Sequence, residues 1–392
     1  MIQRFCDLLN DEETNKDEIS RIVKTLPGNV LSYLQYFSLY SIKSNKGHVD
    51  IAKKIVKVLR NEFISKFNGT ITLTYGEVAE SHVGMQLIGT MCERGFCKTE
   101  MLKAQKNFEE LGCKTVMINL NEFLPSDVEN DDEKRQLTVA KTDKEFEAYV
   151  LVIRDGVRCL TDNKDGDKHL LNEMLFYPWD TKLYNERRGI VQNKNVRYNL
   201  NFDKVGQEAD FTQGMGTTIP FNDVPLLNHV RKRLGDVFGE QANDLKCEGN
   251  KYYEPKGTGI GYHGDSERRK VIGVRLGRPM NMHWMWYYNT RPRGVNVKVQ
   301  LQPGDIYCMS QKSVGTDWKA NLKMGWNMKR YTLRHAAGAP KYTTKTGKLE
   351  IRNQRSYNED ITVGDIYFKV KEGNITRYEK CNLIVVILYS EI

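Results

Sequence analysis

This sequence of 392 residues has no paired cysteine motif and no long apolar run, and it contains few prolines. Ten prolines, with 40% hydrophobic and 28% charged residues, exclude a wholly disordered chain and indicate a globular protein. The eight cysteines include no Cys-x-x-Cys pair, which argues against a zinc framework or a disulfide scaffold. That cysteine usage favours a reducing compartment.

No segment of the sequence suits a membrane span or a secretion signal. The longest apolar run, Leu383-Ile-Val-Val-Ile-Leu-Tyr389, is too short to cross a bilayer and predicts a buried strand. The first residues, Met1-Ile-Gln-Arg-Phe-Cys-Asp, have neither a basic start nor an apolar core. We therefore expect an intracellular protein of the cytoplasm or nucleus that has no membrane partner.

Positive charge is concentrated in one part of the chain. The formal net charge is +9, yet residues 250–352 alone hold 20 Lys and Arg against six Asp and Glu. The rest of the chain is therefore net acidic, and a polyanionic partner is expected to meet residues 250–352.

Periodicity divides the chain into three expected domains. Residues 1–66 read as a helical segment, because apolar residues recur every three or four positions in 19–26 and 49–59. Residues 67–165 read as a small mixed α/β domain, and a charged connector at 161–168 separates it from a strand-rich domain, 166–392.

Within these domains the pattern predicts individual elements. Strands are expected at 70–75, 116–120, 148–153 and 271–277, and helices at 99–111 and 223–234. The acidic run 127–134 is interpreted as a loop, and the polar residues 76–82 as the solvated start of a helix.

The chemistry of the chain centres on Tyr262-His263-Gly264-Asp265. Side chains two residues apart on a strand point to the same face, so His263 and Asp265 can share one metal ion. A distant His would complete a two-His-one-carboxylate triad, which leaves open positions on Fe(II). We expect His335 in this role, because the distal His of such a triad comes from a strand remote in sequence. The rival His283 follows Asp265 by only about one strand and a turn.

Further motifs follow in a fixed order around this pair: Asn250-Lys-Tyr252 before it, then Leu276-Gly277, Gly304-Asp305, His335 and Arg352. This order resembles the AlkB-type Fe(II)/2-oxoglutarate dioxygenases over roughly the last 200 residues. One departure is a longer stretch between Gly304-Asp305 and His335, which carries residues 312–330 as an insertion.

The resemblance implies a C-terminal double-stranded β-helix (jelly-roll) of antiparallel strands, giving an α+β protein with a helical and mixed α/β N-terminal region. It also implies Fe(II) held by His263, Asp265 and His335, with 2-oxoglutarate as co-substrate. Asn250, Tyr252 and Arg352 would contact the co-substrate, since the planar fork of Arg suits a carboxylate. Arg330 and Arg334 are rivals for the Arg352 role.

A nucleic-acid base, single-stranded or flipped out of a duplex, is the expected substrate, with demethylation as one outcome. Basic groups neutralise phosphates and aromatic rings stack on bases, and four of the five Trp lie in the basic stretch. Two alternatives stay open: a protein side-chain hydroxylase on the same scaffold, and a nucleic-acid-binding module without catalysis. By the same resemblance residues 197–199 are either a substrate lid or, alternatively, an edge strand. The expected substrate contacts are Arg197, Tyr198, Arg268, Arg269 and Trp318.

Overall fold

The computed structural model describes residues 16–25, 50, 54–55, 67–254, 257–319, 330–338, 361–362, 366–372 and 375–381. The first helix described, α2 (Lys16–Thr25), has Asp17 and Glu18 in its first turn, where the helix dipole favours negative charge. Ile19 and Val23, four residues apart, are its buried side chains. Most of the second helix expected for the N-terminal segment, at 49–59, lies outside the described residues.

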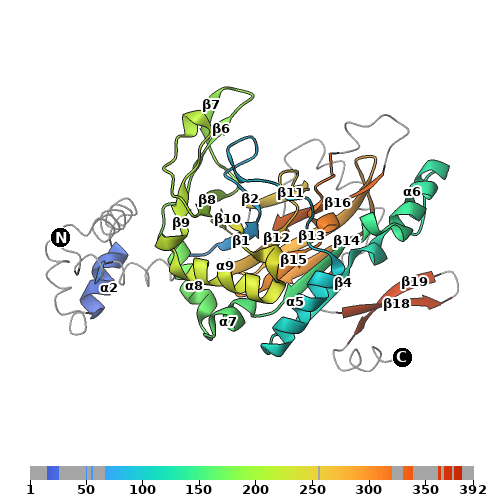
Figure 1. Ribbon diagram of the computed structural model, residues 1–392, viewed down its shortest axis with the longest axis horizontal. Coiled ribbons are helices and arrows are strands. Elements are labelled where there is room, and N and C mark those ends of the chain that lie inside the picture. Colours follow the sequence, from blue (N-terminus) through green and yellow to red (C-terminus); the bar gives the residue numbers. More distant parts are fainter. Residues whose placement is uncertain are drawn as a thin grey trace.

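A large, open sheet of eight strands organises the rest of the chain (Figure 1). All its pairs are antiparallel except the last, between β8 and β9. In spatial order the strands are β4 (Thr115–Asn119), β5 (Tyr149–Ile153), β15 (Ile306–Met309), β12 (Val271–Gly277), β1 (Thr70–Gly76), β10 (Lys246–Tyr252), β8 (Tyr198–Asp203) and β9 (Thr218–Pro220).

One face of this sheet is apolar and is covered by helices (Figure 1). Side chains that alternate to this face, such as Ile71 and Leu73 of β1, join the apolar sides of the helices in one core. The covering helices are α5 (Lys98–Glu110), α7 (Gly156–Thr161), α8 (Gly166–Leu175) and α9 (Pro225–Phe238).

A second sheet of five strands packs on the opposite face. Its inner side chains, such as Met282 and Trp284 of β13, meet Tyr307 and Met309 of β15 in a second core. Its strands in spatial order are β11 (Gly259–His263), β16 (Tyr331–Gly338), β13 (Met280–Tyr288), β14 (Arg291–Leu301) and β17 (Ile361–Thr362).

Smaller elements complete the described residues. The elements not yet named are three hairpins and two helices. They are β2 (Val78–Glu80) with β3 (Leu87–Gly89), β6 (Lys182–Asn185) with β7 (Ile190–Asn193), β18 (Ile366–Glu372) with β19 (Ile375–Cys381), α6 (Asp131–Thr142) and α10 (Gln311–Val314). Short 3-10 turns lie at 120–123, 144–146, 211–213, 221–223 and 240–242.

The mixed α+β class expected from the sequence is confirmed, and most expected elements form within one or two residues of their predicted ends. Two local interpretations were wrong. The acidic run contains the start of α6, because the Asn130 side chain accepts a hydrogen bond from the backbone N–H of Glu133 and caps the helix. The polar run 76–82 contains the strand β2 rather than a helix start, and Ser81 is buried.

The expected connector at 161–168 is a short link between α7 and α8 in one helical layer. Strands from both sides of that boundary share the eight-stranded sheet: β1 lies between β10 and β12, and β5 lies beside β15. A disulfide between Cys113 and Cys159, 46 residues apart, joins the chain before β4 to α7.

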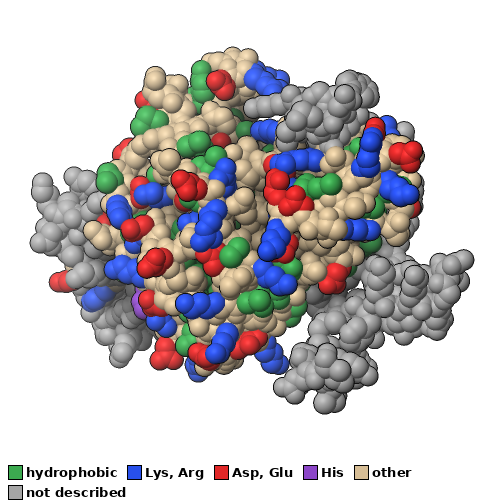
Figure 2. Space-filling model, turned by 45° about the vertical axis from the view of Figure 1, so that its right-hand side comes forward, with side chains coloured by type: hydrophobic (Ala, Val, Ile, Leu, Met, Phe, Trp, Pro, Cys, Tyr) green, Lys and Arg blue, Asp and Glu red, His purple; other side chains and the backbone are tan. Residues whose placement is uncertain are grey.

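The positive charge of residues 250–352 is partly internal. Five of its cationic side chains are buried among the described residues: Arg268, Arg275, Arg293, Lys312 and Arg334. On the face drawn in Figure 2, Lys and Arg side chains lie interspersed with Asp and Glu. The surplus counted from the sequence therefore overstates the positive charge available to a partner.

Gly273 offers a test of how closely strands β12 and β15 of the eight-stranded sheet pack. It pairs with Tyr307 across β12 and β15, and a Cβ at this position would overlap the tyrosine ring. We expect Gly273→Ala to lower the free energy of unfolding by about 1–3 kcal/mol, the usual cost of overpacking. Urea denaturation measures this. Gly261→Ala is the matched control, because nothing lies within 4 Å of its Cβ position; equal stability of the two variants would contradict the packing.

Candidate metal centre

A cavity of about 360 Å³ lies between the two sheets. Its floor is the polar face of β1 and β10, and its opposite wall comes from β11, β13 and β16. The lining includes Thr72, Thr74, Glu80, His82, Arg197, Glu248, Asn250, Tyr252, His263, Asp265, Glu267, Arg268, Met282, Tyr307, Trp318, Lys319 and His335.

The structure brings His263, Asp265 and His335 together in this cavity. Asp265 Oδ1 lies 3.4 Å from His263 Nε2 and 3.6 Å from His335 Nε2. One ligand atom from each residue lies within 4.8 Å of the others, a spacing that could hold a metal ion. The rings of the two histidines are 4.4 Å apart, because His263 and His335 are cross-strand partners on β11 and β16.

His283 lies outside this cluster. It is on β13, and the neighbours of its ring are Asn296, whose Nδ2 is 3.3 Å from His283 Nδ1, and Tyr262. The inner face of β13 at this level carries Trp284, which pairs with His335 across the sheet.

Asp265 reaches the cluster from a loop and not from a strand. Strand β11 ends at His263, and the backbone N–H of Asp265 donates to the carbonyl of Val314. Gly264 makes this approach possible, because a Cβ there would overlap the backbone of Gly315. The strand alternation inferred from the sequence is therefore wrong as the cause of the pairing, although the two residues that it named do lie together.

Electrostatics favour the ionised carboxylate and the neutral imidazole that a metal requires. Burial would raise the pKa of Asp265, but the hydrogen bond from His263 and the charges of His335 and Arg268 outweigh it, so the pKa lies well below its usual range. Burial lowers the pKa of His335 to about 3, helped by His263 and opposed by Asp265. His335 Nδ1 is buried and has no hydrogen-bond partner among the residues that the structure describes.

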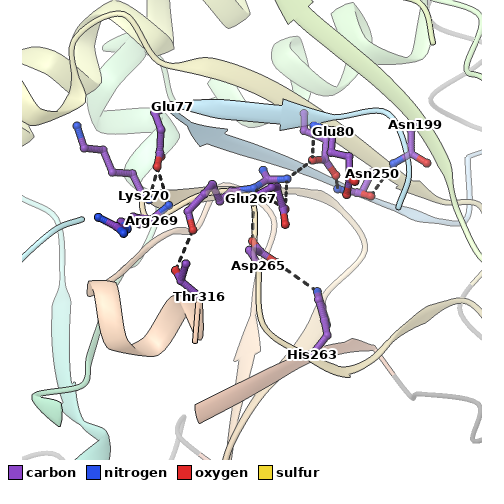
Figure 3. A network of polar contacts seen from close by, with 12 residues as sticks. Glu77, Glu80, Asn199, Asn250, His263, Asp265, Glu267, Arg269, Lys270 and Thr316 are labelled. Atoms are coloured by element: carbon purple, nitrogen blue, oxygen red, sulfur yellow. Dashed lines mark hydrogen bonds and ion pairs between the residues drawn. The ribbon is translucent and has the colours of Figure 1, made fainter. Parts of the chain in front are cut away.

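Figure 3 shows Asp265 and His263 directed toward each other, with Glu267 nearby. Arg268 pairs with the carboxylates behind the cluster. Its side chain is 3% exposed and forms ion pairs with Glu248, Glu267 and Asp265. Its carbonyl accepts a hydrogen bond from the Thr316 hydroxyl at 2.9 Å. Arg268 also lines the cavity, so the expected contact with substrate stays a prediction beside this role in charge compensation.

Asn250 and Tyr252 both line the cavity from β10. The Asn250 side chain is already bonded: its Oδ1 accepts from Arg197 Nε and Asn199 Nδ2, and its Nδ2 donates to Glu248. Tyr252 is buried, and burial raises its pKa, so its hydroxyl stays protonated and can donate into the cavity.

Of the three arginines considered for the far carboxylate, Arg352 lies outside the described residues. Arg330 pairs with Glu145 and Asp317. Arg334 alternates away from His335 on β16, and its guanidinium lies over the ring of Tyr287 at 3.9 Å. Neither Arg330 nor Arg334 lines the cavity.

The other expected substrate residues divide in the same way. Arg197 and Trp318 line the cavity, and Trp318 has the cations of Lys319 and Arg334 within about 5 Å of its ring. Tyr198 stacks on Tyr253, and neither of the two lines the cavity. Arg269 is bonded to the carbonyl of Glu93 away from the lining.

The tryptophans of the basic stretch are divided too. Trp284 and Trp286 belong to the core between the sheets, so they are not free to stack on a base. Trp326 lies outside the described residues. Trp318 is therefore the member of the set that meets the cavity.

Sequence reasoning missed the polar floor of the cavity. Thr72 and Thr74 alternate with apolar residues along β1, a pattern that gave the strand but not its role. Glu80 and His82 were assigned to a solvated surface, yet burial raises the pKa of Glu80 to about 8 and lowers that of His82 to about 3. Glu248 carried no signal beyond its place two residues before Asn250.

Comparison with known proteins gives the chain a relative but no activity. The chain is 37% identical over 280 residues to a protein of Acanthamoeba polyphaga mimivirus, uncharacterized protein R156. The alignment covers 71% of this chain and 99% of protein R156. The chain belongs to the same family as protein R156. No protein-family model matches this chain. In the part of this chain that the structure describes, no helix is long and apolar enough to cross a membrane.

We expect metal binding to depend on the three clustered side chains. Co(II), whose visible spectrum reports ligand geometry, should bind the protein, and His335→Ala or His263→Ala should weaken binding by more than about 100-fold, since even outer partners of metal ligands contribute 10–100-fold. Absorbance titration measures this. His283→Ala should bind like the original protein, and stronger loss from that variant would contradict the cluster.

Proposed function

We propose that the protein is an Fe(II)/2-oxoglutarate-dependent oxygenase of the AlkB type. The observation that carries the proposal is the cluster of His263, Asp265 and His335 inside a cavity between two facing sheets. Two imidazoles and one carboxylate are the ligand set of non-haem Fe(II) oxygenases, and they leave coordination positions open for other ligands.

The residues fit such a metal. The donors are nitrogen and oxygen, the carboxylate is ionised, and His335 is neutral at physiological pH. Fe(II) with 2-oxoglutarate would supply oxidation by molecular oxygen, a reactivity that side chains alone lack. The protein's part is to orient the ligands through Arg268 and to keep the cavity dry behind Tyr252, Met282 and Tyr307.

The double-stranded β-helix belongs to this proposal. Its support is the pairing order β11-β16-β13-β14 in one sheet and β15-β12-β1-β10 in the facing sheet, which surrounds the cavity with antiparallel strands. Strand β1 lies between β12 and β10 in the facing sheet, although it precedes both by more than 150 residues. The strands around the cavity therefore come from segments far apart in sequence.

We further assign roles to Asn250 and Tyr252. Because the Asn250 amide is occupied by Arg197, Asn199 and Glu248, it holds Arg197 at the edge of the cavity and is a positioning residue. Tyr252 lines the cavity with a protonated hydroxyl, which would donate a hydrogen bond to 2-oxoglutarate.

The oxygenase is tested by mixing protein, Fe(II) and 2-oxoglutarate without oxygen. We expect a weak visible charge-transfer band, because the 2-oxo acid chelates the iron, and succinate once air is admitted. His263→Ala should lose both signals, whereas His283→Ala should retain both. Metal binding without the band and without succinate would remove the proposal.

For the substrate we propose a nucleic-acid base. The support is Trp318, an aromatic ring at the cavity with Arg334 and Lys319 beside it, together with Arg197 on the cavity wall. A base inserted into the cavity could stack on this ring while its phosphates meet exposed cations such as Lys319. A protein side chain is the competing substrate.

Binding of single-stranded oligonucleotides at several salt concentrations separates these two contributions. Trp318→Ala should weaken binding by about 1–3 kcal/mol with an unchanged salt slope, because stacking releases no counterions. Lys319→Gln should reduce the slope by about one phosphate contact. Succinate formed faster with peptides than with oligonucleotides, and no salt-dependent binding, would replace the nucleic acid by a protein substrate.

A further inference from the structure

Glu80, at the end of β2, lines the cavity and has no ion pair among the described residues. Its Oε1 accepts from the backbone N–H of Gly84 at 3.3 Å, and its Oε2 has no hydrogen-bond partner in the described part of the chain. Burial raises the pKa of Glu80 to about 8, and the charges of Glu267 and Glu248 act in the same direction. Both of those carboxylates already pair with Arg268. Glu80 is therefore held as a neutral carboxyl group, because ionisation would add a further negative charge around one cation.

His82, two residues further along, also lines the cavity and is also neutral. Burial lowers its pKa to about 3, and the charges of Arg197 and Lys194 act in the same direction. Its Nδ1 is buried and has no hydrogen-bond partner among the residues that the structure describes. The chain between Glu80 and His82 is fixed, since Lys194 Nζ donates to the carbonyl of Ser81 at 3.2 Å. The imidazole therefore adds hydrogen-bonding capacity to the cavity without adding charge.

Arg197 supplies donors beside these two groups. Its Nε donates to Asn250 Oδ1 at 2.6 Å, whereas its two Nη groups have no bonded partner in the described residues. Asn250 in turn donates to Glu248, whose other oxygen accepts from the backbone N–H of Glu80 at 3.2 Å, and Figure 3 shows Glu80 next to Asn250. One network of bonds therefore fixes both Arg197 and Glu80, and both line the cavity.

The subsite made by Glu80, His82 and Arg197 suits neither a cation nor an anion. A cation would meet the charge of Arg197, and an anion would meet the carboxylates of Glu248 and Glu267. A neutral carboxyl group offers one O–H donor and one acceptor oxygen, so it pairs through two hydrogen bonds with an N–H next to a carbonyl. The same carbonyl oxygen has a second lone pair for an Nη group of Arg197. A cyclic amide satisfies all three groups.

We propose that Glu80 and Arg197 bind the N–H and C=O edge of an oxo base, so that the cavity selects uracil, thymine, hypoxanthine or guanine over cytosine and adenine. The inference rests on the proposed nucleic-acid substrate and specifies its base. Glu80 accepts from the ring N–H and donates to the neighbouring carbonyl oxygen, to which Arg197 also donates. Cytosine and adenine present an amino group at this position, which gives Arg197 no acceptor.

The test measures binding of single-stranded pentanucleotides that carry one base and four abasic positions. Uracil is compared with cytosine, and hypoxanthine with adenine, because each pair differs at this edge while the number of phosphates stays the same. The full chain is used without 2-oxoglutarate, so that no base is oxidised. Fluorescence anisotropy on the original protein should show about tenfold or stronger preference for the oxo base in both comparisons, the usual discrimination of a bidentate contact to a base edge.

Two substitutions of Glu80 separate its hydrogen bonds from its charge. Glu80→Gln keeps a neutral donor and acceptor and should retain the preference, whereas Glu80→Met removes both and should abolish it. Glu186→Met is the matched control: Glu186 Oε2 lies 3.6 Å from the Cβ position of Gly84, yet Glu186 is exposed and does not line the cavity. This control should keep the preference. If Glu80→Met fails to fold, Glu80→Asp takes its place, because it withdraws the carboxyl group by one methylene and should reduce the preference.

The outcomes separate this assignment from the proposed function. Equal binding in both comparisons, preference retained in Glu80→Met or unchanged in Glu80→Asp, or loss in Glu80→Gln as complete as in Glu80→Met overturns it. Preference for the oxo bases without succinate formation removes the oxygenase and leaves the subsite standing. If no pentanucleotide binds, the nucleic-acid substrate fails, and the free bases decide the subsite. A melting temperature that uracil raises more than cytosine does, in the original protein but not in Glu80→Met, supports the subsite; equal effects overturn it.

Discussion

The compensation of buried charge around Asp265 is the interaction on which the site depends. Three carboxylates, from Glu248, Asp265 and Glu267, share one buried guanidinium, that of Arg268. Without that cation, mutual repulsion and burial would together favour protonation, and Asp265 would lose the charge that a metal requires. Arg268 also joins β10 to the loop after β11, so the same contacts that fix the charge fix the geometry.

The sequence could predict the members of the cluster because ligand types and their order along the chain are local information. His263, Asp265 and His335 were chosen over His283 by residue type and separation, and these three lie together. The reason why Asp265 joins the two histidines was only partly predictable. Asp265 lies beyond the end of β11, and its position depends on a close approach between Gly264 and Gly315. Such an approach leaves no pattern in composition or periodicity.

Strand pairing over long separations could not be predicted. The alternation of residues 70–75 indicated a strand, but not that β1 would lie between β10 and β12, more than 150 residues away in sequence. That pairing brings Thr72 beside Arg275 and turns a row of threonines into the floor of the cavity. Strands on both sides of the connector at 161–168 therefore share one sheet, which the charged composition of that connector did not indicate.

The charges of the cavity lining have an order that favours sequential binding. Glu248, Asp265 and Glu267 surround the cluster end of the cavity, and the cationic lining residues besides Arg268 are Arg197 and Lys319. A dicarboxylate that arrived first would place one negative end next to Asp265. A divalent metal bound first reverses the charge at that end, because the ion is then the largest local charge. Under the proposed function, metal before dicarboxylate is therefore the order that avoids placing a second negative group beside an uncompensated Asp265.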